Sequence, residues 1–353
     1  MVGALLVQRG EIIGQGWHRQ AGQPHAEIEA IRDAERRGHE LKGATLYVTL
    51  EPCSTHGRTP PCTDAIKVAG IARLVVGAAD PNPKHSGKGF QLLRRARVHL
   101  TTDVLKQDCE VLNEAFNHWI VHRTPFVTVK AAMTMDGKIA TASGESKWIT
   151  GTPARAYGMK LRQGADAVLV GINTILADDP RLTYRSQQRG RFQISNLKSR
   201  FAGPRRIVLD ARARTPLKAN VVSDEWNGLT TIVAGKDAPK SRVKALEKKV
   251  RVLVAPALDG KIDLKWLLKK LGAEEVTSLL VEGGGEVNAS FLSGRLAQQI
   301  VFFYAPKILG GRNARKAVAG QGAMRPDEIL DLENVEWRKI GEDLVLNAKV
   351  AMK

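Results

Sequence analysis

The sequence predicts an α/β protein of two domains, residues 1–123 and 124–353. Its 353 residues are enough to bury two hydrophobic cores. Strand-like apolar runs alternate with helical patterns in both halves, which is typical of layered α/β domains. The second half opens at 126–132 with an almost continuous apolar run, as expected of a strand whose sheet is covered on both faces.

In the first half, two strands joined by a turn at Arg9 and Gly10 open the chain, and helices and strands then alternate. The expected strands are 3–8, 11–17, 44–50 and 73–78, and the expected helices are 25–37, 62–69, 89–95 and 104–119. The first helix shows helical spacing of its apolar residues, and the second follows Pro60 and Pro61, which favour a helix start. Cys109 falls in the last of these helices, where a small buried apolar side chain is expected.

In the second half, strands and helices again alternate. The expected strands are 126–132, 167–170, 206–209, 230–234, 250–254 and 278–281, and the expected helices are 152–163, 241–248, 264–271 and one starting near Glu286. Two strand-like segments, 299–304 and 344–351, close the chain. The pattern indicates a mostly parallel sheet with an antiparallel hairpin at its end, and 187–203 reads as a polar loop.

Composition excludes several classes of protein. No run of 18 apolar residues occurs, so no membrane span is expected, and no secretory signal is visible at the N-terminus. Three cysteines are too few for a disulfide framework, and we therefore expect a reducing, cytoplasmic location.

The net charge of +18 is concentrated in the second half, where 38 basic residues face 23 acidic ones. Ten basic residues lie between Arg185 and Lys218, against one acidic residue, Asp210. Such a field suits a polyanion or a phosphorylated small molecule, and a solvated basic loop is the alternative. Only Phe192 and Phe201 are aromatic there, so a stacking surface for single-stranded nucleic acid is not indicated.

A metal site that activates water is indicated by His25, Glu27, Cys53 and Cys62. Catalytic zinc takes three protein ligands and leaves the fourth position to water, which it makes nucleophilic near neutral pH. A glutamate that is not a ligand can then move protons. His-x-Glu followed by Pro-Cys-x-x-Cys is typical of zinc deaminases acting on nucleobases. Here eight residues separate the cysteines instead of two.

The expected elements place the three ligands where they can converge. His25 is expected at a helix start, Cys53 after a strand, and Cys62 at a second helix start, where the helix dipole would favour its thiolate. The alternative is a surface histidine with two structural cysteines.

Two features of the second half indicate a ligand site. Glu282 precedes three glycines and a helix start, an arrangement that lets main-chain N–H groups approach a phosphate, although a plain tight turn explains it equally well. Residues 171–185 follow a strand, and open α/β sheets bind ligands at the carboxyl ends of their strands.

Together these residues resemble the bifunctional riboflavin-biosynthesis deaminase–reductases of bacteria over nearly the whole chain. The matching segments are 22–27, 50–62, 80–83, 130–138, 146–151, 177–180 and the glycine turn. In that family eight residues between the two cysteines are expected. The resemblance implies a cytidine-deaminase-like three-layer domain followed by a dihydrofolate-reductase-like domain.

The activity that the resemblance implies has two steps. A diamino-pyrimidinone bearing a ribosylamino 5′-phosphate first loses its 2-amino group as ammonia. NADPH then delivers hydride to C1′ of the ribose, which opens to a ribityl chain. A dimer or tetramer formed through the reductase half is also expected of the family.

The resemblance also implies roles for individual residues. For deamination it implies zinc ligands His25, Cys53 and Cys62, the proton carrier Glu27 and a substrate contact from Arg58, for which a loop salt bridge is the alternative. For reduction it implies NADPH contacts from Ala132, Trp148, Thr174, Asp178, Gly284, Gly285, Glu286 and Val287, and substrate contacts from Ser146, Arg162, Leu182, Arg185 and Glu282. The two arginines suit bidentate phosphate contacts. Lys130 is the candidate for assisting hydride transfer, with structural pairing as the alternative.

One departure from the family concerns the N-terminus. Family members usually have a helix and an Asn-Pro segment before the first strand, and that segment helps to bind the pyrimidine. Here the first strand begins at Val2, so either this sequence starts too late or the first active site is incomplete. In the second case we expect weak deamination with intact reduction. A reductase-only protein and a nucleic-acid-directed zinc deaminase are the alternative interpretations.

Overall fold

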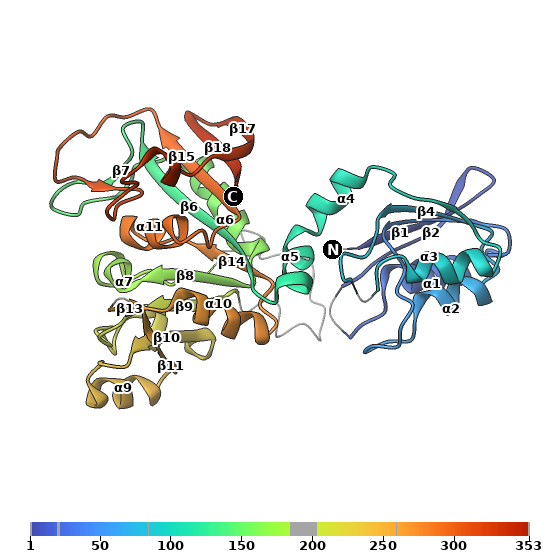
Figure 1. The fold of residues 1–353 in the computed structure, drawn as a ribbon, viewed down its shortest axis with the longest axis horizontal. Helices are drawn as coiled ribbons and strands as arrows, with labels where there is room; N and C mark the ends of the chain where they lie inside the picture. The colour runs from blue at the N-terminus through green and yellow to red at the C-terminus, as the bar shows by residue number, and fades with distance from the viewer. Residues whose placement is uncertain (1, 20–21, 84, 184–202, 259, 352–353) are drawn as a thin grey trace. The chain divides into compact units, whose positions relative to one another are not determined.

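The computed structural model of the chain describes residues 2–19, 22–83, 85–183, 203–258 and 260–351. The chain divides into two compact units, Met1–Arg123 and Thr124–Lys353, which Figure 1 shows as ribbons. Within the described ranges, no helix has both the length and the apolar character that a bilayer crossing requires.

The first unit is built on a five-stranded sheet with the strand order β2-β1-β3-β4-β5. These strands are β1 Gly3–Gln8, β2 Glu11–Trp17, β3 Thr45–Leu50, β4 Arg73–Ala78 and β5 His99–Thr101. β1 pairs antiparallel with β2 and β3, whereas β3, β4 and β5 are parallel. Arg9 and Gly10 form the predicted turn and both have positive φ. The carboxyl ends of β3 and β4 therefore share one edge of the sheet.

Three helices cover one face of this sheet, namely α1 Ala26–Arg36, α2 Cys62–Val68 and α3 Lys88–Arg95. Their apolar residues, among them Ile31, Ile66 and Leu93, form one core with Leu6 and Leu46 of the strands. α1 packs closely on β2 because Gly14 and Gly16 leave no side chain between them. A Cβ atom on either glycine would collide with the helix backbone.

The sequence prediction was wrong at the end of this unit. The single helix expected at 104–119 is two helices, α4 Lys106–Leu112 and α5 Glu114–His122, which meet at Asn113. Neither helix buries a residue completely, so the helical spacing there did not mark a core face. Cys109 is only partly buried, against Gly77 of β4, and strand β5 was not predicted.

The second unit contains a nine-stranded sheet with the order β11-β10-β9-β8-β14-β6-β15-β18-β17. In chain order these are β6 Phe126–Thr134, β8 Ala167–Gly171, β9 Arg205–Leu209, β10 Thr230–Gly235, β11 Arg251–Ala255, β14 Ser278–Val281, β15 Gln299–Ala305, β17 Leu332–Ile340 and β18 Asp343–Val350. The first seven in spatial order are parallel, and β18 and β17 complete the sheet as antiparallel strands. The predicted parallel sheet with an antiparallel end is thus confirmed. β17 was missed because it is exposed along almost its whole length.

Helices cover both faces of this sheet (Figure 1). They are α6 Thr152–Gly164, α7 Ile172–Asp178, α8 Asn220–Ser223, α9 Lys240–Glu247, α10 Leu264–Ala273 and α11 Gly285–Ser293. Neighbouring residues of β15 belong to different cores, because Phe302 packs in the cluster of α10 and α11, whereas Phe303 packs against α6. The short helices α7 and α8 were not predicted.

The remaining elements of this unit are short. They are the paired strands β7 Lys138–Ala140 and β16 Arg315–Lys316, the paired strands β12 Ala257–Leu258 and β13 Lys261–Ile262, and the 3-10 turns Asn227–Leu229 and Pro326–Glu328.

Candidate functional site

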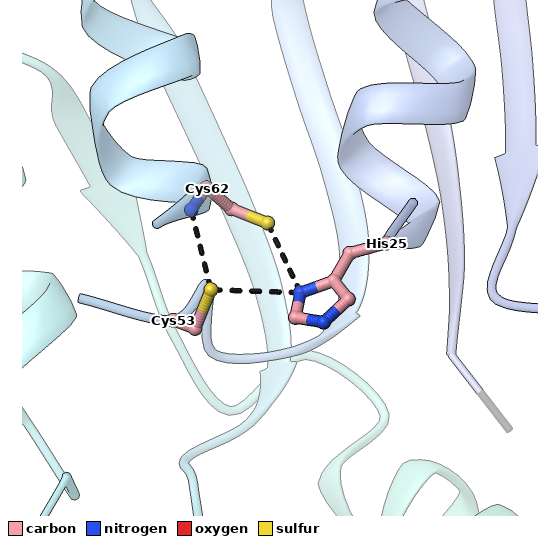
Figure 2. Close-up of side chains that lie close together, drawn as sticks. All are labelled: His25, Cys53 and Cys62. Atoms are coloured by element: carbon pink, nitrogen blue, oxygen red, sulfur yellow. Dashed lines mark hydrogen bonds between the residues drawn. The ribbon is translucent and has the colours of Figure 1, made fainter. Parts of the chain in front are cut away.

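The structure brings His25, Cys53 and Cys62 together (Figure 2). His25 is the N-cap of α1, Cys53 follows β3, and Cys62 is the first residue of α2. Their ligand atoms all lie within 4.8 Å of one another. Nδ1 of His25 is 3.5 Å from Sγ of Cys53 and 3.3 Å from Sγ of Cys62. The other ring nitrogen of His25 lies 3.3 Å from the Thr59 hydroxyl, which fixes the ring orientation.

This geometry fits a zinc ion. With the usual zinc–sulfur and zinc–nitrogen bond lengths, tetrahedral coordination separates a nitrogen ligand from a sulfur ligand by about 3.6 Å. The two nitrogen–sulfur distances, 3.5 and 3.3 Å, are close to that value. One imidazole and two thiols are also the donor types that zinc prefers. The three side chains could therefore hold the ion with little rearrangement.

The two thiols are hydrogen-bonded to each other, and their pKa values shift in opposite directions. A hydrogen bond from the Cys62 thiol is the main cause that lowers the pKa of Cys53, and the main-chain N–H of Cys62 also donates to the Cys53 sulfur, at 3.2 Å. The pKa of Cys62 is raised, because this thiol donates a hydrogen bond to the Cys53 sulfur and is buried. That the dipole of α2 favours the Cys62 thiolate as a metal ligand stays a prediction.

Glu27 lies beside this cluster in the first turn of α1 and is 3% exposed. Burial raises its pKa to about 6, and a hydrogen bond with the Cys62 thiol acts weakly in the opposite direction. A carboxyl group whose pKa lies near neutrality can both accept and release a proton at physiological pH. The pKa of His25 is also raised, mainly by its hydrogen bond with Cys53.

Glu51 is a residue of this site to which the sequence analysis gave no role. Its buried carboxylate accepts hydrogen bonds from the main-chain N–H groups of Asp80, Gly87 and Gly89, at 3.1, 2.9 and 2.9 Å. It therefore attaches the segment that follows β4 to the strand end that carries Cys53. The position of Glu51 directly before Pro52 and Cys53 was the sequence feature that could have indicated this role. Arg58 lies exposed on the loop between the two cysteines.

In the second unit, Lys130, Arg162 and Glu282 form one charged group. Glu282 follows β14, Lys130 lies on β6 next to it, and Arg162 reaches Glu282 from α6. Nε of Arg162 donates to Glu282 at 2.8 Å, and Nη2 donates to the same oxygen. The guanidinium edge that would bind a phosphate with two hydrogen bonds is thus directed at Glu282. Burial lowers the pKa of Lys130, whose ammonium lies 5.6 Å from the ring centre of Phe303.

The glycine turn lies at the same carboxyl edge of the sheet. A Cβ atom on Gly283 would collide with Val287, and one on Gly285 would collide with the main-chain carbonyl of Lys316. Packing therefore requires glycine at both positions. A Cβ atom on Gly284, the N-cap of α11, would meet nothing within 4 Å. The N–H groups of a first helical turn have no partners within the helix, so this open position suits a phosphate.

The other predicted residues of this half lie on several elements. Ala132 lies on β6, Thr174 and Asp178 lie on α7 after β8, and Glu286 and Val287 lie in the first turn of α11. Ser146 and Trp148 lie on the loop before α6, with the Trp148 ring 65% exposed. Leu182 is 2% exposed, so its side chain belongs to the core and only its main chain could meet a ligand. Arg185 lies outside the described residues.

The basic stretch 185–218 is described only from residue 203 onward. Two of its arginines form ion pairs within the fold, Arg205 with Glu274 and Arg206 with Asp224. Those two charges serve the structure and offer no polyanion surface.

The comparisons with known proteins agree with this arrangement. Residues 1–78 match the cytidine and deoxycytidylate deaminase zinc-binding region, and residues 125–346 match the RibD C-terminal domain. The protein is therefore a bifunctional enzyme in which a zinc-binding deaminase domain precedes a reductase domain. Riboflavin biosynthesis protein RibD of Actinobacillus pleuropneumoniae is 40% identical over 98% of this chain and 88% of its own length. RibD of Aquifex aeolicus is 43% identical over 98% of this chain and 90% of its own length. The chain belongs to the RibD family.

Solved structures show the same relationship. RibD of Acinetobacter baumannii superimposes with a TM-score of 0.84 at 32% identity, covering 99% of this chain and 92% of that one. A TM-score of 0.79 at 33% identity, with the same coverage, is found for a Thermotoga maritima protein. That protein is a diaminohydroxyphosphoribosylaminopyrimidine deaminase/5-amino-6-(5-phosphoribosylamino)uracil reductase. The predicted family, fold class and bifunctional activity are confirmed. The two-step interpretation is favoured over the reductase-only protein and over the nucleic-acid-directed deaminase.

Proposed function

We propose that the first unit deaminates a diamino-pyrimidinone bearing a ribosylamino 5′-phosphate, and that the second reduces the product with NADPH. The observation that carries the first half is the convergence of His25, Cys53 and Cys62 within 4.8 Å, beside a buried glutamate. These three residues would hold zinc, which as a Lewis acid makes a water molecule nucleophilic near neutral pH. The deamination chemistry then needs a group that moves protons.

Glu27 is that group in the proposed mechanism. Its carboxylate takes a proton from the attacking water and passes it to the 2-amino group of the pyrimidinone, which leaves as ammonia. A pKa of about 6 lets one carboxyl group perform both transfers at neutral pH. Arg58, exposed on the loop between the cysteines, would contact the anionic substrate.

For the second step, the edge formed by β6, β8 and β14 would bind NADPH. The cofactor supplies the hydride, and the protein binds and orients it. The proposed cofactor contacts are Ala132, Trp148, Thr174, Asp178, Gly284, Gly285, Glu286 and Val287. The open N-terminus of α11 at Gly284 supports this assignment, because main-chain N–H groups bind phosphates.

The substrate of the reductase would lie next to the charged group of Lys130, Arg162 and Glu282. Its proposed contacts are Ser146, Arg162, Leu182, Arg185 and Glu282, with Leu182 acting through its main chain. Lys130 would assist hydride transfer to C1′, and its place beside Arg162 and Glu282, two of the proposed substrate contacts, supports this assignment.

We further propose a homo-oligomer, a dimer or tetramer, formed through the reductase unit. The edge strand β17 supports this, because Val335 and Trp337 are about half exposed on it. A cytoplasmic location is proposed from the three free cysteines.

One incubation tests the two-step function. The purified protein is given the diamino-pyrimidinone ribosylamino 5′-phosphate with and without NADPH, and the products are identified by mass. We expect the deaminated compound without NADPH and its ribityl derivative with NADPH. Recovery of unchanged substrate in both reactions, from protein that contains stoichiometric zinc, would contradict the proposal.

A further inference from the structure

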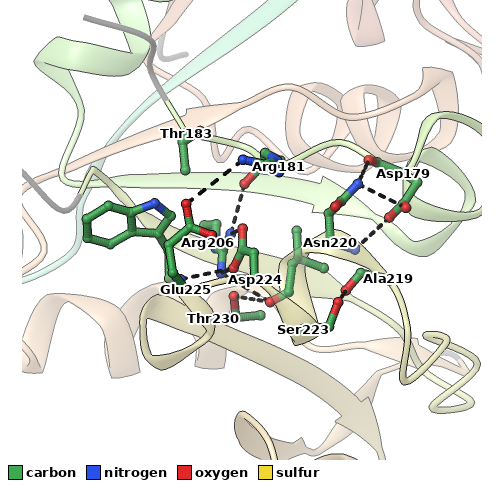
Figure 3. Close-up of polar contacts among 12 residues, drawn as sticks. Asp179, Arg181, Thr183, Arg206, Ala219, Asn220, Ser223, Asp224, Glu225 and Thr230 are labelled. Carbon is green, nitrogen blue, oxygen red and sulfur yellow. Dashed lines mark hydrogen bonds and ion pairs between the residues drawn. The ribbon is translucent and has the colours of Figure 1, made fainter. Parts of the chain in front are cut away.

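The loop Asp179–Thr183, which follows α7, is anchored by a buried ion pair (Figure 3). Arg206 of β9 is completely buried, and the side chain of Asp224 is 4% exposed. Nη1 and Nη2 of Arg206 donate to the two carboxylate oxygens of Asp224 at 2.7 and 2.8 Å. Nη1 also donates to the main-chain carbonyl of Arg181 at 2.9 Å. A completely buried side chain thus holds one peptide group of the loop by a hydrogen bond.

Asn220, the first residue of α8, fixes the beginning of the same loop. Its main-chain N–H donates to a carboxylate oxygen of Asp179 at 2.8 Å, and its side-chain amide donates to the carbonyl of Asp179 at 2.8 Å. Asp179 and Leu182 both have positive φ, of 40° and 53°. Residues other than glycine keep this conformation only where their surroundings enforce it.

The other end of the loop reaches the proposed substrate site. Nη1 of Arg162 lies 3.4 Å from the carbonyl oxygen of Thr183, and the rest of the same guanidinium is bonded to Glu282. The loop therefore connects the buried pair with two proposed substrate contacts, Arg162 and Glu282, and it contains a third, Leu182. A displacement of the Arg181 peptide would move Leu182 and Thr183 with it.

The desolvation cost of this buried ion pair indicates that the pair serves to fix the loop conformation and not to stabilise the fold. Burying an ion pair costs desolvation, and replacing such a pair with uncharged residues of similar size often leaves stability unchanged or higher. The hydrogen bond from Arg206 to the Arg181 carbonyl, in contrast, requires a donor at this position. A fixed loop conformation is therefore one contribution of the buried pair to the fold, besides the hydrogen bond from Nη2 of Arg206 to the carbonyl of Val221 in α8 at 3.2 Å.

We propose that Arg206, supported by Asp224 and Asn220, is a positioning residue for substrate binding in the reductase unit. It holds the main chain of Asp179–Thr183 in the conformation that accepts the phosphorylated substrate. This inference rests on the proposed reductase function.

The test measures substrate affinity in variants of the full-length protein. Arg206→Met combined with Asp224→Asn removes both buried charges and so leaves neither unpaired. We expect the dissociation constant of the deaminated substrate, measured by calorimetry without NADPH, to rise about tenfold or more, since small displacements in binding sites have effects of that size. KM for this substrate should rise equally, with little change in kcat or in KM for NADPH. Arg206→Lys, which keeps a donor, should recover part of the affinity.

Arg205→Met is the matched control. Arg205 is the neighbouring residue on β9, but it pairs with Glu274 and not with the loop. The dissociation constant of the deaminated substrate should be the same for Arg205→Met as for the wild type. Ammonia release should be unchanged in all variants, which shows that the first unit is intact, and an unchanged KM for NADPH shows that the second unit is folded.

Asn220→Ala keeps the inference testable if the double variant does not fold. Asn220 is only partly buried, and we expect its loss to weaken substrate binding several-fold through Asp179. Wild-type affinity in a folded double variant, or in Asn220→Ala if the double variant unfolds, would overturn the positioning role and leave the proposed function intact. A wild-type protein that neither binds nor reduces the substrate would overturn both.

Discussion

Two buried glutamates near the His25, Cys53 and Cys62 cluster have different roles because their hydrogen-bond partners differ. The Glu51 carboxylate accepts several main-chain N–H groups, so it is bound to the fold and has no capacity left for substrate chemistry. Glu27 is equally buried but lies against the cluster, and burial raises its pKa to about 6. Only Glu27 is therefore suited to carry a proton between water and a leaving amine.

The first prediction concerns this carboxyl group. Glu27→Gln keeps the size of the side chain and removes its ability to accept a proton, so ammonia release should fall by a factor of about 10² to 10⁴. Zinc content, measured by elemental analysis, should stay at one ion per chain because no ligand is changed. Glu29→Gln, on the same helix, should release ammonia at the wild-type rate. Full turnover by Glu27→Gln would show that another group carries the proton.

The second prediction concerns the metal ligands. Cys62→Ser replaces a preferred sulfur donor with a hydroxyl, and we expect the protein to retain only a small fraction of its zinc and to release no ammonia. Cys109→Ser is the control, because Cys109 packs against Gly77 of β4 and is not in the cluster. It should bind zinc normally. Equal zinc contents in the two variants would exclude the His25, Cys53 and Cys62 site.

At the scale of elements, the helices and strands that the sequence predicted are mostly those whose residues face a hydrophobic core. β8 and β14 were found because they are buried along their length, whereas β17 is exposed and β5 has only three residues. The candidate zinc ligands were identified because each stands in a short local motif, His25 before Glu27 and Cys53 after Pro52, although 28 residues separate His25 from Cys53. The Glu51 contacts and the pair of Arg206 with Asp224 were not found, since they join residues that only the folded chain brings together.

The third prediction concerns Glu274, which links two strands of the large sheet. Arg251 of β11 and Arg205 of β9 donate hydrogen bonds to it, and they lower its pKa from the ordinary 4.5 to about 2. A carboxyl group whose pKa is lowered by folding stabilises the folded protein at pH values above its ordinary pKa. For Glu274 this contribution is lost as the pH falls from about 4.5 to about 2.

Glu274→Gln should therefore reduce the free energy of unfolding by about 1 kcal/mol at neutral pH, a value limited by partial exposure. The difference from the wild type should shrink as urea unfolding is repeated at lower pH. Glu333→Gln, on the exposed strand β17, should show no such difference. A Glu274→Gln difference that is independent of pH would contradict the ion-pair explanation.

The fourth prediction concerns the loop that carries Trp148. Nζ of Lys307 donates to the main-chain carbonyls of Trp148 and Ile149 at 3.0 and 2.8 Å, and the guanidinium of Arg155 lies 4.5 Å from the Trp148 ring centre. Lys307→Met should raise KM for NADPH about three- to tenfold, because a typical hydrogen bond contributes about 0.5–1.5 kcal/mol net and both of these bonds are exposed. The measurement is steady-state reduction of the deaminated substrate. Lys339→Met, on β17, should leave KM unchanged, and an unchanged value in Lys307→Met would remove Lys307 from this role.

At the scale of the whole molecule, each proposed site is assembled from one unit. The described zinc-cluster residues all lie before Arg123, and the described reductase residues all lie after Thr124. Either reaction can therefore be removed without changing the residues that perform the other. The product of the first step also keeps the phosphate and the ribose on which the second step acts.

The fifth prediction follows from this separation. Glu27→Gln should still reduce the deaminated substrate, and Lys130→Met should still release ammonia. A mixture of the two variants, given the diamino-pyrimidinone phosphate and NADPH, should form the ribityl product, because the intermediate can leave one protein and bind another. The yield is followed by mass, with each variant alone as the control. If the mixture accumulated the deaminated compound while wild-type protein at the same concentration formed the final product, the intermediate would have to pass directly between the two sites of one molecule.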